Sequence, residues 1–99
     1  MRYQQGPDGC LQLCLSDDAN WNEFEQWSAV ICRLCNGRIL ERIDGLDQRY
    51  WDIEIGGRIV TLHLEHYLGI CLFATEKAAD EVIRGIGNAL DANGAATDV

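Results

Sequence analysis

The stretch Arg49-Tyr50-Trp51-Asp52-Ile53-Glu54-Ile55-Gly56-Gly57-Arg58-Ile59-Val60-Thr61-Leu62-His63-Leu64 decides the fold of this chain. Two runs rich in β-branched and aromatic residues flank a Gly-Gly pair, which can adopt the positive φ angles of a two-residue hairpin turn. This loop length fixes the cross-strand pairs, which are Ile53–Val60 and Trp51–Leu62 on one face and Asp52–Thr61 and Tyr50–His63 on the other. One face is apolar and the other mostly polar, so the sequence predicts an antiparallel hairpin packed on a core.

The segments on either side of the hairpin predict three more strands and two helices. Alternating leucines indicate a strand over residues 10–15, and Asn20 followed by Glu23 resembles a capping box at the start of a helix that ends at Asn36-Gly37. A short strand is expected over residues 38–43, and a strand that is apolar on both faces, hence central in the sheet, over residues 67–74. Thr75 is expected to cap a second, amphipathic helix over residues 76–92.

This element order, β-α-β-β-β-β-α, predicts an α+β fold with a mainly antiparallel sheet of four to five strands and two helices on one face. A chain of 99 residues is long enough for one hydrophobic core and too short for two, so residues 10–94 are expected to form a single domain. Residues 1–9 contain two glycines and a proline without periodicity, which predicts a flexible N-terminal arm. Residues 95–99 are expected to fray.

The composition excludes several classes of function. Sixteen acidic against eight basic side chains give a formal charge of −8, which opposes binding to nucleic acid and to anionic membranes. No apolar run approaches the roughly 18 residues of a membrane span, and no apolar segment of a signal peptide follows the N-terminus. The sequence therefore predicts a cytoplasmic protein that binds neither nucleic acid nor membrane.

Five cysteines, an odd number, are expected to be free thiols, most of them buried. The pair Cys32 and Cys35 has the spacing of a redox motif, but both thiols fall in the last turns of the expected helix, where the helix dipole disfavours a thiolate. A zinc site that adds Cys10 and Cys14 is opposed by geometry, because an extended strand separates those two by roughly 13 Å. We therefore expect no metal and no cofactor.

An enzymatic alternative rests on the segment His63-Leu64-Glu65-His66. His63 and Glu65 point to the same side of a strand, and Asp52 lies on the polar face of the neighbouring strand. These three residues leave open a small metal-dependent or acid/base enzyme. The sequence contains no GxSxG, P-loop, GxGxxG or HExxH motif, so a non-enzymatic role is favoured and no catalytic residue is assigned.

A surplus of apolar residues instead favours protein binding. The apolar arc of the first helix is wider than a surface helix needs, and the strand over residues 67–74 has apolar residues on its second face. The candidate protein-binding residues are Trp21, Trp27, Asp52, Glu54, His63 and Phe73. The expected partner is another protein or a second copy in a homodimer.

In size, acidity and element order, the chain resembles small acidic bacterial proteins that bind another protein, such as toxin-immunity proteins and secretion chaperones. This resemblance implies a small non-enzymatic protein-binding module.

Overall fold

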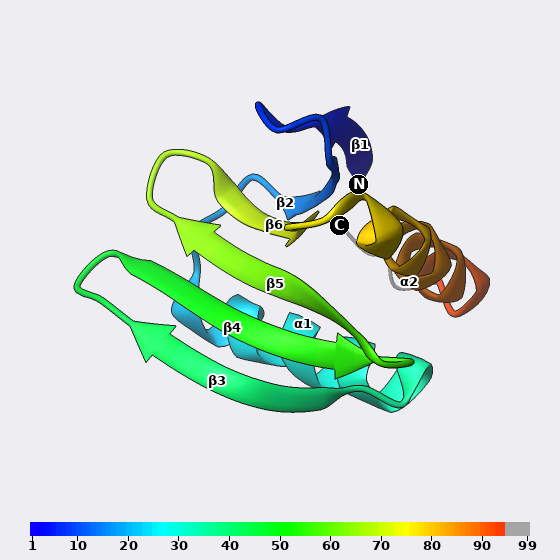
Figure 1. Ribbon diagram of the computed structural model, residues 1–99. Helices are drawn as coiled ribbons and strands as arrows, with labels where there is room; N and C mark the ends of the chain where they lie inside the picture. Colours follow the sequence, from blue (N-terminus) through cyan, green and yellow to red (C-terminus); the bar gives the residue numbers. More distant parts are fainter. Residues whose placement is uncertain (95–99) are drawn as a thin grey trace.

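The computed structural model describes residues 1–94, which form one sheet and two α-helices (Figure 1). The elements in chain order are β1 (Arg2–Gln5), β2 (Leu11–Ser16), α1 (Trp21–Cys35), β3 (Arg38–Asp44), β4 (Gln48–Ile55), β5 (Arg58–Glu65), β6 (Gly69–Ala74), a 3₁₀ turn η1 (Lys77–Ala79) and α2 (Asp80–Ala92).

The sheet has the strand order β1-β2-β6-β5-β4-β3, and every pair of neighbours is antiparallel. The α+β class and the antiparallel sheet are therefore confirmed, while the sheet of the described residues has six strands rather than four to five. Strand β6 lies between β2 and β5, which confirms that this doubly apolar segment is central. The meander from β3 to β6 places β6 beside β2, so α1 connects two strands that lie far apart in the sheet.

The additional strand comes from residues 1–9, and here the expectation of a loose arm is corrected. Arg2–Gln5 pairs with Leu11–Cys14 as an edge strand. The connecting turn is held by the amide of Cys10, which donates to Asp8 Oδ1 over 2.9 Å, and by Gly9, whose φ is +81°. Polar edge strands lack the apolar alternation by which strands are recognised, because neither face is deeply buried. The tail over residues 95–99 lies outside the described residues.

The central hairpin has the predicted register. Trp51 lies opposite Leu62 and Ile53 opposite Val60, and Gly56 and Gly57 have φ angles of +59° and +81°. The next hairpin is shorter than expected, because β6 begins at Gly69 and the residues before it form the turn. Tyr67 and Leu68 belong to that turn and are 87% and 60% exposed there.

The two helices begin differently. The side chain of Asn20 accepts from the amide of Glu23 over 2.9 Å, which confirms the N-cap of α1. The predicted cap at Thr75 is wrong, because η1 intervenes and α2 begins at Asp80. Asp80 is buried and accepts from the amide of Leu11 over 2.8 Å, a hydrogen bond that lowers the pKa of its carboxyl and ties the start of α2 to β2.

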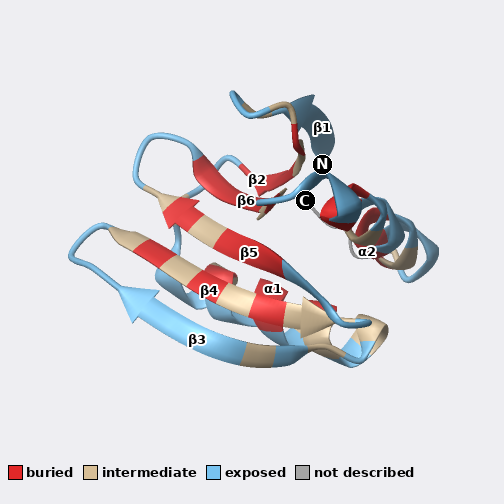
Figure 2. Ribbon diagram, viewed as in Figure 1, coloured by how far each residue is buried: buried red, intermediate tan, exposed pale blue. Residues whose placement is uncertain are grey.

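Both helices pack on the same face of the sheet, where they share one core with it. Figure 2 shows the buried residues along β2, β6, β5 and β4, whereas β3 is exposed along most of its length. The fully buried side chains of this core include Leu13, Leu15, Phe24, Ile31, Ile53, Leu62, Leu64, Ile70, Leu72, Ile83, Ile86 and Leu90. Within residues 1–94 no helix lies over the opposite face of the sheet, and this open face holds most of the polar residues singled out by the sequence.

Two glycines in α2 give a matched test of this packing. A Cβ at Gly85 would meet no atom within 4 Å, whereas a Cβ at Gly87 would meet the ring of Tyr3 on β1. We expect Gly85→Ala to raise the free energy of unfolding by about 0.5–1 kcal/mol, the usual helix-propensity difference. Gly87→Ala should gain less, because Tyr3 must move.

Urea unfolding of both variants checks this prediction. The same two substitutions are also made in a chain that carries Tyr3→Ala. In that background Gly87→Ala should recover the full gain. Equal gains for both alanine variants in the unmodified chain would show that β1 does not lie against α2.

Candidate functional site

The open face of the sheet is built from cross-strand rows, each of which takes one residue from each strand. The row that we call the cysteine row crosses all six strands and consists of Arg2, Cys14, Cys71, His63, Tyr50 and Ile43. The next row consists of Gln4, Gln12, Phe73, Thr61, Asp52 and Glu41. Side chains directly opposite one another on neighbouring strands are in contact distance. The sheet order therefore juxtaposes residues that are far apart in the sequence.

Two thiols meet in the middle of the cysteine row. Cys14 on β2 and Cys71 on β6 are paired across the strands, and their Sγ atoms are 2.9 Å apart with Cys71 donating. Both residues are buried, although neither described helix covers this face. Burial raises the pKa of Cys71 to about 12, and the contact with Cys14 adds to that shift. At neutral pH the Cys71 thiol is therefore protonated.

His63 is the next member of this row, and its ring lies between two other rings. It stacks on Tyr50 with 4.2 Å between ring centroids and meets Phe73 edge-on at 5.7 Å. Burial lowers the pKa of His63, partly offset by Glu65, so the imidazole is neutral at neutral pH. Its Nε2 atom is buried and has no hydrogen-bond partner among the residues described.

A pocket of about 320 Å³ opens over these side chains. It is lined by Cys14, Cys71, His63, Tyr50 and Phe73, together with Arg2, Gln4, Gln12, Leu68 and Gly69. The lining combines aromatic rings with amide groups and one guanidinium, a mixture typical of sites for small polar ligands. Gln4 donates to Gln12 over 2.8 Å, so these two amides are held in place.

The fold places the candidate protein-binding residues named from the sequence in three different parts of the molecule. His63, Phe73, Asp52 and Glu54 lie on the open face, whereas Trp21 lies at the start of α1 and is 38% exposed. Trp27 faces the core and is 8% exposed, with its Nε1 donating to Glu23. Trp27 is therefore unavailable as an interface anchor.

Of the three residues of the enzymatic alternative, Asp52 has a structural partner on the neighbouring strand. Asp52 accepts a hydrogen bond from the Thr61 hydroxyl over 2.8 Å. Burial raises the pKa of Cys32 and of Cys35, so neither thiol of the CxxC pair is activated. Among residues 1–94, no group of three or more His, Cys, Asp or Glu side chains is arranged to hold a metal ion.

A second exposed surface lies at the end of the sheet where the turns β3–β4 and β5–β6 project (left in Figure 1). Leu46 is fully exposed in the first turn, and Tyr67 and Leu68 are exposed in the second. Gly69 lies against the backbone of Ser16 and Asp17, so the loop before α1 is at the same end. We define the tip surface by its apolar residues Trp21, Leu46, Tyr67 and Leu68 and by its acidic residues Asp17, Asp18, Asp47 and Glu65.

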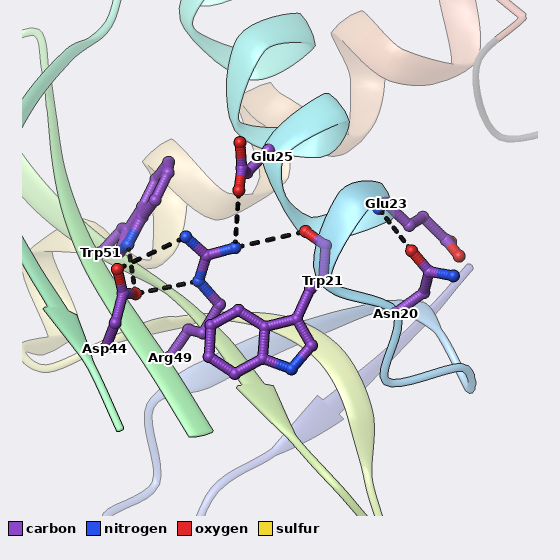
Figure 3. A network of polar contacts seen from close by, with 7 residues as sticks. All are labelled: Asn20, Trp21, Glu23, Glu25, Asp44, Arg49 and Trp51. Atoms are coloured by element: carbon purple, nitrogen blue, oxygen red, sulfur yellow. Dashed lines mark hydrogen bonds and ion pairs between the residues drawn. The ribbon is translucent and has the colours of Figure 1, made fainter. Parts of the chain in front are cut away.

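The tip surface is anchored by Arg49, a residue that the sequence reading did not single out. Its side chain is 6% exposed, donates to Asp44 and Glu25 at 2.9 and 3.0 Å, and donates to the carbonyl of Trp21 at 3.2 Å (Figure 3). The guanidinium carbon is 4.5 to 4.9 Å from the ring centroids of Trp21, Phe24 and Trp51. Hydrogen bonds from Arg49 lower the pKa of Asp44. The sequence signal for this anchor is the presence of these three aromatic residues and of Asp44, the acid at the end of β3.

Comparison with protein families identifies one match. A model described as "Protein of unknown function (DUF3630)" matches residues 1–84, from β1 into α2. The chain belongs to the DUF3630 family. No curated protein and no solved structure matches this chain. In the described part of this DUF3630 chain, neither helix has the length and apolar character required to span a membrane.

The Arg49 anchor of this DUF3630 chain yields a prediction about stability. Arg49→Lys keeps the charge but loses the planar fork that reaches Asp44, Glu25 and Trp21, so the free energy of unfolding should fall by roughly 1–3 kcal/mol. Arg58→Lys is the matched control, because Arg58 and Glu76 are both exposed and 3.7 Å apart. The control should change stability by less than about 0.5 kcal/mol. Denaturant unfolding at neutral pH measures both, and equal losses would contradict a special role for Arg49.

Proposed function

We propose that this protein is a non-enzymatic protein-binding module whose tip surface binds a basic, partly apolar segment of another polypeptide. The observation that favours this role is the exposure of large apolar side chains at one end of the sheet. Leu46 is fully exposed and Tyr67 is 87% exposed, although both are in turns, where polar residues are usual. Clustered exposed apolar residues are typical of interaction sites, whereas single ones are ordinary.

The charge around these residues supports the choice of partner. Asp18 and Asp47 are exposed, and Asp17 is paired with the exposed Arg2 over 3.3 Å. The charge of Arg49 is compensated by its ion pairs with Asp44 and Glu25, so it does not neutralise the acidic residues of the tip surface. With a net charge of −8 on the whole chain, basic partners are attracted over long range. Exposed apolar and acidic side chains at one end of the sheet therefore fit a segment that combines lysine or arginine with aromatic or aliphatic residues.

The same charge argues against a second copy as the occupant of the tip surface. Two identical acidic surfaces brought face to face place like charges together, which is unfavourable in a dry interface. The partner proposed here is therefore a different polypeptide.

The test compares two variants as baits. Leu46→Ser/Tyr67→Ser removes the apolar tips, and Ile59→Ser removes an apolar side chain that is 41% exposed near the opposite end of the hairpin. All three positions are exposed, so each variant should fold like the unmodified chain. A polypeptide captured from the source cells and then purified should bind the unmodified chain and Ile59→Ser equally. Its affinity for the double variant should be at least about tenfold lower, the loss of a small hot spot.

Calorimetric titration at two salt concentrations checks the chemistry. Affinity should fall by roughly tenfold between about 0.05 and 0.5 M salt, because screening weakens the attraction of opposite charges. A captured partner that is acidic, or that binds the double variant unchanged, would overturn the proposal. Sedimentation that shows a stable dimer in place of any complex would favour self-association instead.

A further inference from the structure

The two thiols of the cysteine row have no role in the proposed protein binding, yet they lie close enough to react with each other. Cys14 and Cys71 are 57 residues apart in the sequence and are brought together by the pairing of β2 with β6. Directly opposed residues of antiparallel strands have Cα atoms roughly 4.5–5.5 Å apart, which is within the range that a disulfide spans. The two Sγ atoms, now 2.9 Å apart, need to approach by only about 0.9 Å to reach bonding distance.

The pocket on the open face gives these buried sulfurs access to a small reagent. Both thiols line the pocket, and its volume of about 320 Å³ admits a small molecule but not a folded protein. Arg2 lies opposite Cys14 in the row and also lines the pocket. Its positive charge attracts an anionic reagent.

We propose that Cys14 and Cys71 are a reversible modification site, at which an anionic low-molecular-weight disulfide such as oxidised glutathione converts the two thiols into one intramolecular disulfide. The reagent enters the pocket on the open face, beside Arg2. The product bridges β2 and β6, the pair of strands that joins the N-terminal hairpin to the meander.

The reaction proceeds by two exchange steps. The Cys14 thiolate attacks one sulfur of the reagent, which forms a mixed disulfide and releases a first glutathione thiolate. The Cys71 thiolate then attacks the Cys14 sulfur, which forms the Cys14–Cys71 bond and releases a second thiolate. The two protons from the cysteines end on the two released thiolates, so two cysteines are oxidised and one disulfide is reduced to two thiols.

The arrangement assigns the two cysteines to these steps. Cys71 donates its S–H to the Cys14 sulfur, so this hydrogen bond stabilises the Cys14 thiolate as it forms. Cys71 reacts second, and its proton is taken up by a released glutathione thiolate.

The experiment treats the reduced full chain with oxidised glutathione and then counts free thiols. Two of the five thiols should disappear, and digestion without reduction should yield a peptide linked through Cys14 and Cys71. The melting temperature should rise by roughly 10 °C or more, because the bridge closes a long loop in the unfolded chain. Added dithiothreitol should reverse both changes.

Matched variants separate this site from the other cysteines. Cys32→Ser/Cys35→Ser should form the bridge at the same rate, whereas Cys71→Ser should stop at a mixed disulfide on Cys14. Arg2→Gln should slow the reaction with oxidised glutathione several-fold and leave the reaction with neutral hydroxyethyl disulfide unchanged, since only the first reagent is anionic.

The result that overturns the proposal needs no variant. Five titratable thiols after oxidation of the folded chain, or a bridge mapped to Cys32 and Cys35 instead, would show that the Cys14–Cys71 contact is packing only. Because thiol counting requires no partner, its outcome is independent of whether the tip surface binds a basic polypeptide.

Discussion

The placement of Arg49 in a nearly dry site between β4 and α1 is the constraint on which the structure of the tip surface depends. A buried guanidinium is tolerated only when its donors are satisfied and its charge is compensated. Here the donors reach Asp44, Glu25 and the carbonyl of Trp21, and three aromatic rings surround the planar group. The side chains of Asp44 and Glu25 are 42% and 58% exposed, so both carboxylates keep contact with water while the guanidinium of Arg49 is buried. This arrangement lowers the desolvation cost relative to a fully buried ion pair.

That network also defines the shape of the tip surface. Asp44 is the last residue of β3, and it accepts from both Arg49 and the indole of Trp51. The turn that presents Leu46 therefore starts from a carboxylate held at two points. The other partners of Arg49, Trp21 and Glu25, belong to the first turns of α1, so the same cation holds the helix start against the hairpin. An exposed leucine on a turn held this firmly costs less conformational entropy on binding than one on a free loop.

The sequence predicts the parts of this fold whose signals are local. The Gly56-Gly57 turn fixes the register of its hairpin, and Asn20 fixes the start of α1, because each depends on neighbours within a few residues. Strand β1 escaped prediction because its polar residues lie at an edge, and its partner on α2 is Gly87, more than eighty positions along the chain. Arg49 escaped because a charged side chain beside a turn is usually hydrated. The meeting of Cys14 with Cys71 depends on strand order, which no local pattern contains.

The two surfaces described here are contiguous, and this follows from residues that belong to both. Leu68 is an apolar member of the tip surface and also lines the pocket over the cysteine row. Arg2 lies in that row and pairs with Asp17 on the rim of the tip surface. A basic segment bound as proposed would compete with Arg2 for Asp17, and its apolar side chains would cover Leu68, which also lines the pocket. The proposed partner and the proposed disulfide reagent would then compete for the same opening. The open face and the tips are therefore one physical unit, in which the edge strand β1 supplies the cation that joins them.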